Sequence, residues 1–131
     1  MSLPQKKFRE IVFQLLFSHD FYKIDGDDFI PIMMKLLKTT KKNISSVKDY
    51  LDLILQKKDD LDNLIEQKAK EYKLNRISKV ELNILRLGFF EINFNKEIPK
   101  KVALAEAMRL TKKFGSSSST KFINAVLDSK E

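Results

Sequence analysis

Apolar residues recur every three or four positions along most of the chain, which is the spacing that places them on one face of an α-helix. Such stripes predict four helices in the first half of the chain, the first from about Pro4 to Tyr22. A loop at 25–27 would end it, and Asp27 or Asp28 could cap the next helix. The four stripes are Phe8, Ile11, Val12, Leu15 and Leu16; Ile30, Met33, Met34 and Leu37; Val47, Tyr50, Leu51 and Ile54; and Leu61, Leu64, Ile65, Ala69 and Tyr72.

A fifth helix is predicted to form the centre of the domain. It opens with Ser78 and Glu81, at the spacing of a capping box, in which the two residues satisfy free amides at a helix start. Apolar residues then follow on two opposite faces. Because a helix that is apolar on nearly every side is buried on nearly every side, Arg86 and Glu91 are expected to form internal ion pairs there.

Two more helices are predicted near the end of the chain. Pro99 can occupy the first turn of the sixth, which Gly115 would end. A hydroxyl-rich run, 116–120, then leads into a short last helix. With only three Gly and three Pro in 131 residues, the chain lacks the turns of an all-β fold. We therefore expect one all-α domain spanning 1–131.

The net charge of +7 is concentrated in two short stretches. Residues 1–9 contain three basic residues and no acidic one, and residues 100–121 contain six basic residues and one acidic residue. The rest of the chain is therefore close to neutral. If the two stretches meet in space, they form a basic patch of the kind that attracts nucleic-acid phosphates.

Several kinds of chemistry are excluded by composition. The chain has no Cys, and its one His, His19, cannot build a histidine metal site alone. No phosphate-binding glycine loop or catalytic motif is present, and the paired acidic residues at 27–28 and 59–60 fit helix caps. We expect no enzyme activity, no metal and no cofactor. Without a membrane span or a secretory signal, a soluble cytoplasmic protein is predicted.

The start of the last helix is the first candidate binding site. A helix N-terminus offers free amides to an anion, and the hydroxyls of 116–120 together with Lys121 add donors and charge. Phe122 could stack on an unpaired base. The alternative is a serine-rich connector with Phe114 and Phe122 both in the core.

The first helix carries a second candidate site. Phe13, Phe17 and Phe21 lie four residues apart, opposite the main apolar stripe. The helix is then either sandwiched within the fold or offers an aromatic ridge to a partner. We assign Phe13 to the core and take Phe17 as the better contact. Glu81, near the exposed end of the fifth helix, could also face outward.

At several linked motifs the chain resembles the NusB family of bacterial transcription antitermination factors. The resemblance covers nearly the whole chain, although 23–60 contributes little. The motifs are Ile98-Pro99-x-Lys101-Val102-Ala103, Glu106-Ala107, Lys113-Phe114-Gly115, Lys121-Phe122-Ile123-Asn124-Ala125-Val126-Leu127-Asp128, Val80-Glu81-x-x-Ile84-Leu85-Arg86-Leu87 with Phe90-Glu91, and Arg9-Glu10 with Gln14 and Leu16-Phe17.

The resemblance implies an all-α fold of about seven helices, arranged as two small bundles packed across each other, and no catalysis. NusB-like proteins pair with NusE, a small-subunit ribosomal protein. The pair binds single-stranded boxA-type RNA and joins the RNA polymerase antitermination complex, notably in ribosomal RNA operons. The family's contacts with NusE map to Phe17 and Glu81, and its contacts with RNA map to Lys6, Lys7, Arg9, Ser118, Lys121 and Phe122.

The RNA positions fall in or beside the two basic stretches. Four phosphate contacts, by Lys6, Lys7, Arg9 and Lys121, predict a slope of log K against log salt near −3, from about 0.7 per phosphate on single strands. Ser118 stands where the family often has an acidic residue, which should strengthen RNA binding. Tyr72 stands where Trp is common, which we interpret as a packing substitution.

Two other functions remain open. NusB-like domains also precede RNA cytosine methyltransferases, but the 131 residues leave no room for a cofactor-binding α/β domain. The chain could instead be a helical adaptor that binds only protein through Phe17. The sequence does not decide whether the chain forms a homodimer.

Overall fold

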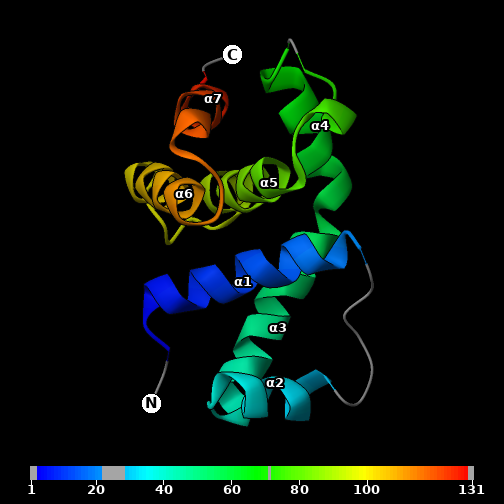
Figure 1. The fold of residues 1–131 in the computed structure, drawn as a ribbon, viewed down its shortest axis with the longest axis vertical. Helices are drawn as coiled ribbons and strands as arrows, with labels where there is room; N and C mark the ends of the chain where they lie inside the picture. Colours follow the sequence, from blue (N-terminus) through cyan, green and yellow to red (C-terminus); the bar gives the residue numbers. More distant parts are fainter. Residues whose placement is uncertain (1–2, 22–28, 71, 130–131) are drawn as a thin grey trace. The chain divides into compact units, whose positions relative to one another are not determined.

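The computed structural model describes residues 3–21, 29–70 and 72–129. Within those ranges the chain is all helical, with seven α-helices, two short 3₁₀ helices and no strand, which confirms the predicted fold class. The chain divides into two compact units, Met1–Leu55 and Gln56–Glu131. The elements, labelled in Figure 1, are α1 (Gln5–His19), α2 (Phe29–Leu37), α3 (Lys41–Gln56), α4 (Lys58–Lys68), η1 (Leu74–Arg76), α5 (Lys79–Phe94), α6 (Lys100–Phe114), η2 (Ser117–Ser119) and α7 (Thr120–Leu127).

The first unit contains α1, α2 and most of α3. An aromatic contact joins α1 to α3, since the rings of Phe8 and Tyr50 meet edge to face with centroids 5.5 Å apart. The start of α3 is capped by a hydroxyl, because the Thr40 Oγ1 accepts a hydrogen bond of 3.1 Å from the Asn43 backbone N–H. The apolar stripes predicted for these two helices are largely buried, among them Val12 and Leu51.

Two predictions in this unit need correction. The first helix ends at His19 and not near Tyr22, which lies outside the described residues together with the predicted 25–27 loop and the two candidate aspartate caps. The apolar stripe predicted for the second helix is not fully buried, because Met33 and Met34 are both half-buried. Phe29 is the buried residue of α2, whose predicted stripe borders the surface.

The second unit is built around α5, as the sequence predicts. Every residue from Leu82 to Glu91 is buried, and α5 contacts α4, α6 and α7. A glycine allows α7 to approach α5 closely. A Cβ atom at Gly88 would lie 2.9 Å from both Cδ atoms of Leu127, so any larger residue would force the Leu127 side chain to shift, and α7 lies against the α5 backbone.

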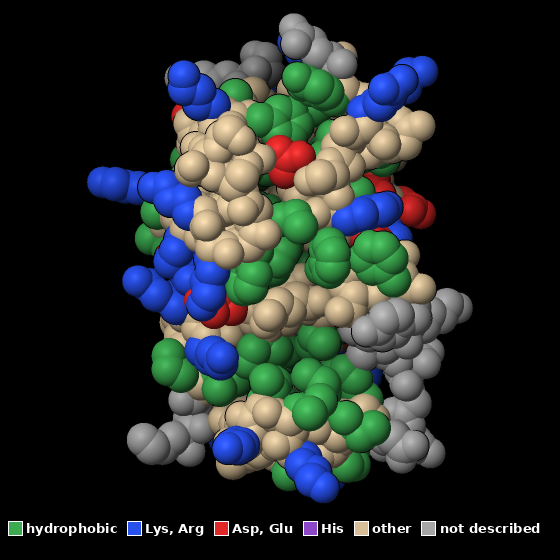
Figure 2. All heavy atoms as spheres, viewed as in Figure 1, with side chains coloured by type: hydrophobic (Ala, Val, Ile, Leu, Met, Phe, Trp, Pro, Cys, Tyr) green, Lys and Arg blue, Asp and Glu red, His purple; other side chains and the backbone are tan. Residues whose placement is uncertain are grey.

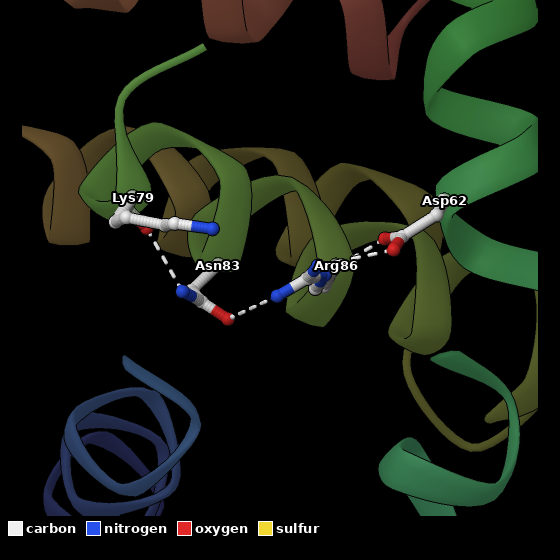
Figure 3. A network of polar contacts seen from close by, with 4 residues as sticks. All are labelled: Asp62, Lys79, Asn83 and Arg86. Carbon is white, nitrogen blue, oxygen red and sulfur yellow. Dashed lines mark hydrogen bonds and ion pairs between the residues drawn. The ribbon is translucent and has the colours of Figure 1, made fainter. Parts of the chain in front are cut away.

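A network of polar contacts joins α4 to α5 (Figure 3). The Arg86 guanidinium makes two hydrogen bonds to the Asp62 carboxylate, from Nε to Oδ1 at 2.8 Å and from Nη2 to Oδ2 at 3.0 Å. Its Nη1 donates to the Asn83 Oδ1 at 3.1 Å, and the Asn83 amide donates to the Lys79 backbone carbonyl at 2.9 Å. The expected internal ion pair of Arg86 is confirmed.

Two helix boundaries in the second unit differ from the sequence prediction. The fourth helix ends at Lys68, so Ala69 is its C-cap and Tyr72 lies beyond it in a non-helical segment. Pro99 is the N-cap of α6 and not part of its first turn, whereas Gly115 ends α6 as predicted. Tyr72 therefore does not lie on the apolar face of the fourth helix, where its spacing in the sequence had placed it.

Replacing Asp62 by Ala should lower the free energy of unfolding by about 3–5 kcal/mol, because it leaves the buried Arg86 guanidinium without its counterion. The side chain of Arg86 is 6% exposed and that of Asp62 is 17% exposed, so water replaces the lost carboxylate poorly. Urea denaturation measures the change. As a control, Gln67→Ala on the exposed face of the same helix should change stability by less than about 0.5 kcal/mol.

Candidate nucleic-acid interface

The turn before α7 is shaped by its own hydroxyl groups. The Ser116 Oγ lies 2.9 Å from the Ser118 Oγ and 3.2 Å from the Ser119 Oγ, and the Thr120 hydroxyl donates to the Ser117 carbonyl at 2.7 Å. Ser118 is exposed. The run is therefore a defined surface turn, and the Ser118 hydroxyl can exchange its serine partner for a ligand.

Lys121 and Phe122 follow this run and lie in the first turn of α7. Lys121 is exposed, and Phe122 is half-buried. The ring of Phe122 meets that of Tyr72 edge to face, with centroids 5.2 Å apart. The structure thus brings Ser118, Lys121 and Phe122 together, and the reading in which Phe122 lies wholly in the core is wrong. Phe114 is also half-buried.

Ion pairs reduce the charge that the second basic stretch presents. The Arg109 guanidinium binds the Glu106 carboxylate within the same helix at 3.0 Å, and the Lys100 Nζ lies 3.2 Å from the Asp128 carboxylate. Figure 2 shows Lys and Arg side chains gathered over α6. Lys101, Lys112, Lys113 and Lys121 of this stretch are also exposed.

The first turn of α1 carries the other basic residues. Lys6 and Lys7 are exposed, whereas Arg9 is buried, with 6% of its surface accessible. A buried guanidinium cannot meet an RNA phosphate without first leaving its surroundings. These residues belong to the first unit and the α7 residues to the second. That the two groups form one cationic surface therefore stays a prediction.

Phe13 and Phe17 of α1, with Phe21 just beyond its end, form a graded series. Phe13 is 2% exposed, Phe17 is half-buried and Phe21 is 60% exposed. Neighbouring rings touch, with centroids 6.4 Å apart between Phe13 and Phe17 and 5.2 Å apart between Phe17 and Phe21. The assignment of Phe13 to the core is confirmed. Phe17 has a buried neighbour on one side and an exposed one on the other, a geometry that suits a contact residue.

Glu81, the other candidate partner contact, also caps α5. The Ser78 Oγ accepts a hydrogen bond of 3.1 Å from the Glu81 backbone N–H and donates one of 2.8 Å to the Glu81 carboxylate. The predicted capping pair therefore exists, with the carboxylate bound to the hydroxyl. Glu81 is half-buried, so its carboxylate is oriented by the cap while part of the residue reaches the surface.

A third basic segment was missed by the sequence analysis. Residues 68–79 contain five basic residues and one acidic residue, and they include Tyr72. This local excess of positive charge is visible in the sequence. It is hidden when the charges outside the two basic stretches are summed, because that sum is close to zero. Of these basic residues, Lys70, Lys73, Arg76 and Lys79 are exposed.

Replacing Ser78 by Ala should lower the free energy of unfolding by about 1 kcal/mol, since an amide at the start of α5 loses its side-chain acceptor. Thermal and urea denaturation measure the change. Ser119→Ala is the matched control, because Ser119 is the N-cap of α7 and its side chain makes no capping bond. Equal losses in the two variants would contradict a capping role for Ser78.

The described ranges show neither a metal cluster nor a membrane span. No group of three His, Asp or Glu side chains within them could hold a metal ion. None of the helices within them is both long enough and apolar enough to cross a membrane.

Comparison with known proteins places this arrangement among antitermination factors. A family model described as "NusB family" matches residues 6–131. The transcription antitermination protein NusB of Clostridium novyi is 38% identical, with 95% of this chain and 96% of that protein covered. The protein of the same name from Thermotoga maritima is 35% identical, with 98% of this chain and 90% of that protein covered.

Solved structures show the same fold. Thermotoga maritima NusB has a TM-score of 0.81 and 32% identity, covering 98% of this chain and 90% of that chain. A chain in the structure of the antitermination factors NusB and NusE in complex with dsRNA has a TM-score of 0.78 and 26% identity. The match covers 94% of this chain and 92% of that chain.

Proposed function

Since the chain belongs to the NusB family of transcription antitermination proteins, we propose that it binds boxA-type RNA together with NusE. In that complex it promotes antitermination by RNA polymerase in the cytoplasm, notably in ribosomal RNA operons. Members of this family are transcription factors and not enzymes, so the chain is not an enzyme. It matches 96% of the length of the Clostridium novyi antitermination protein at 38% identity, which supports this function.

One structural observation carries the proposal. The turn into α7 presents an exposed hydroxyl at Ser118, an exposed ammonium at Lys121 and a partly exposed ring at Phe122 within five residues. These groups supply a hydrogen-bond donor, a charge for a phosphate and a surface for a base. The related NusB–NusE structure, solved in complex with dsRNA, supports RNA as the ligand.

The proposed contacts come from one domain spanning 1–131. Lys6, Lys7 and Lys121 meet phosphates, because all three are exposed. Arg9, 6% exposed, is left out of the direct contacts. Phe17 and Glu81 contact NusE.

The affinity for boxA-type RNA should fall with salt at a slope near −2 in log K against log salt. Three phosphate-bound lysines each contribute about 0.7 on a single strand, and the buried Arg9 contributes nothing. Fluorescence anisotropy of a labelled RNA, titrated with the chain and NusE at several salt concentrations, measures the slope. A slope near zero would contradict phosphate binding, and a slope near −3 would indicate a fourth phosphate contact.

The matched control is a lysine of the same charge and exposure at the other end of α6. Lys121→Ala should reduce the slope by about 0.7. Lys96→Ala should leave the slope unchanged, because Lys96 precedes the 15-residue α6, which separates it from the α7 turn by about 22 Å. Lys6→Glu with Lys7→Glu should also weaken RNA binding, because it reverses the charge of two proposed phosphate contacts.

The contact with NusE should depend on the partly exposed ring of Phe17. Phe17→Ala should weaken the complex with NusE by about 30-fold, the loss typical of an aromatic residue at an interface centre. Glu81→Gln should weaken it less and keep the cap of α5, since the amide oxygen still accepts from Ser78. Isothermal titration calorimetry with purified NusE measures both.

An exposed phenylalanine elsewhere serves as the control for this contact. Phe94→Ala in the second unit should leave NusE affinity unchanged, although Phe94 is 43% exposed. Equal losses for Phe17→Ala and Phe94→Ala would point to general destabilisation. A loss of NusE binding with no effect of the lysine substitutions on RNA would favour the adaptor that binds only protein.

A further inference from the structure

The pair formed by Tyr72 and Phe122 exposes more aromatic surface than one ring can. Tyr72 is 48% exposed and meets Phe122 edge to face at 5.2 Å, with an angle of 76° between the ring planes. Tyr72 reaches this position from the non-helical segment that follows α4, where its backbone N–H donates to the Ala69 carbonyl at 3.0 Å. Two segments 50 residues apart in the chain therefore build one aromatic surface.

The charge around this pair is positive on both of its segments. Lys73 follows Tyr72 directly, Lys70 precedes it by two positions with Glu71 between them, and Lys121 precedes Phe122; the three lysines are exposed and outnumber the one acidic residue. An apolar protein surface would gain nothing from such a border of lysines. A polyanion with flat aromatic groups matches both the rings and the charge.

We propose that Tyr72 is a base-stacking residue of the RNA site, and that with Phe122 it holds an unpaired base between phosphates bound by Lys73 and Lys121. This inference rests on the proposed RNA-binding function and extends it to a segment that the sequence analysis missed. The base is unpaired because the faces of paired bases are covered by their neighbours in the duplex. The site therefore selects single-stranded RNA over duplex RNA.

Three substitutions at Tyr72 separate stacking from packing. Tyr72→Phe keeps the ring and should bind boxA-type single-stranded RNA within about twofold of the unchanged chain. Tyr72→Ala should bind about 5- to 150-fold more weakly, the range for loss of one stacked base. Tyr72→Leu keeps an apolar contact for Phe122 but offers no aromatic face, so it should lose as much as Tyr72→Ala.

Salt dependence provides a second readout that a packing role would not produce. Because a tyrosine neutralises no phosphate, Tyr72→Ala should lower the affinity and leave the salt slope unchanged. Lys73 is a fourth phosphate contact beside Lys6, Lys7 and Lys121, so it should steepen the slope of the unchanged chain to about −3, and Lys73→Ala should return it to about −2. Circular dichroism of each variant checks that the helices are intact.

Tyrosine fluorescence reports the contact directly, since the chain has three Tyr and no Trp. Single-stranded RNA should quench the emission, and most of that quenching should disappear in Tyr72→Phe. Tyr50→Phe is the control and should keep the quenching, because Tyr50 packs on Phe8 in the first unit. A duplex RNA of equal length should quench little.

The outcomes distinguish this inference from the function on which it rests. If Lys121→Ala reduces the salt slope while Tyr72→Ala and Tyr72→Leu bind normally, the RNA function holds and the stacking role is overturned. Restored binding in Tyr72→Leu also overturns it, in favour of packing. If Tyr72→Ala weakens only NusE binding, the surface belongs to a protein. If the unchanged chain binds no RNA, both conclusions fall.

Discussion

The burial of α5 on all sides is the constraint on which the second unit depends. Ten consecutive residues of one helix are removed from water, and they include Arg86, a cation that needs a counterion there. The neighbours of α5 are placed by what this helix requires. Asp62 ties α4 to Arg86, and Leu127 fills the space that Gly88 leaves open. The two segments that carry Tyr72 and Phe122 are thus positioned from within the core.

The candidate RNA surface owes its character to which charges remain exposed. Glu106 and Asp128 each bind one basic residue of the 100–121 stretch, and the burial of Arg9 removes another cation from the surface. The count of basic residues in the two stretches therefore overstates the positive charge that they present at the surface. The lysines that remain lie beside hydroxyls and aromatic rings, and such a mixture suits a flexible strand whose phosphates and bases alternate.

Much of the fold could be predicted because its signals are local. Helical periodicity located the helices, and the spacing of Ser78 and Glu81 identified a helix start that the hydrogen bonds confirm. The same locality placed Ser118, Lys121 and Phe122 in one turn. The predictions failed where distant contacts decide the outcome. Tyr72 fits a helical stripe by spacing, but α4 ends before it, and its ring is placed by Phe122. Nor does composition reveal that Arg9 is buried.

The length of α7 has a consequence for how binding and folding are linked. A helix of eight residues is too short to be stable alone in water. The helical conformation of α7 therefore depends on its packing against α5. If the contact between α7 and α5 opens, α7 and the turn before it should unfold while the rest of the second unit stays folded. Occupancy by a ligand would, conversely, slow hydrogen exchange at the amides of this one small helix, making the end of the chain a local sensor of complex formation.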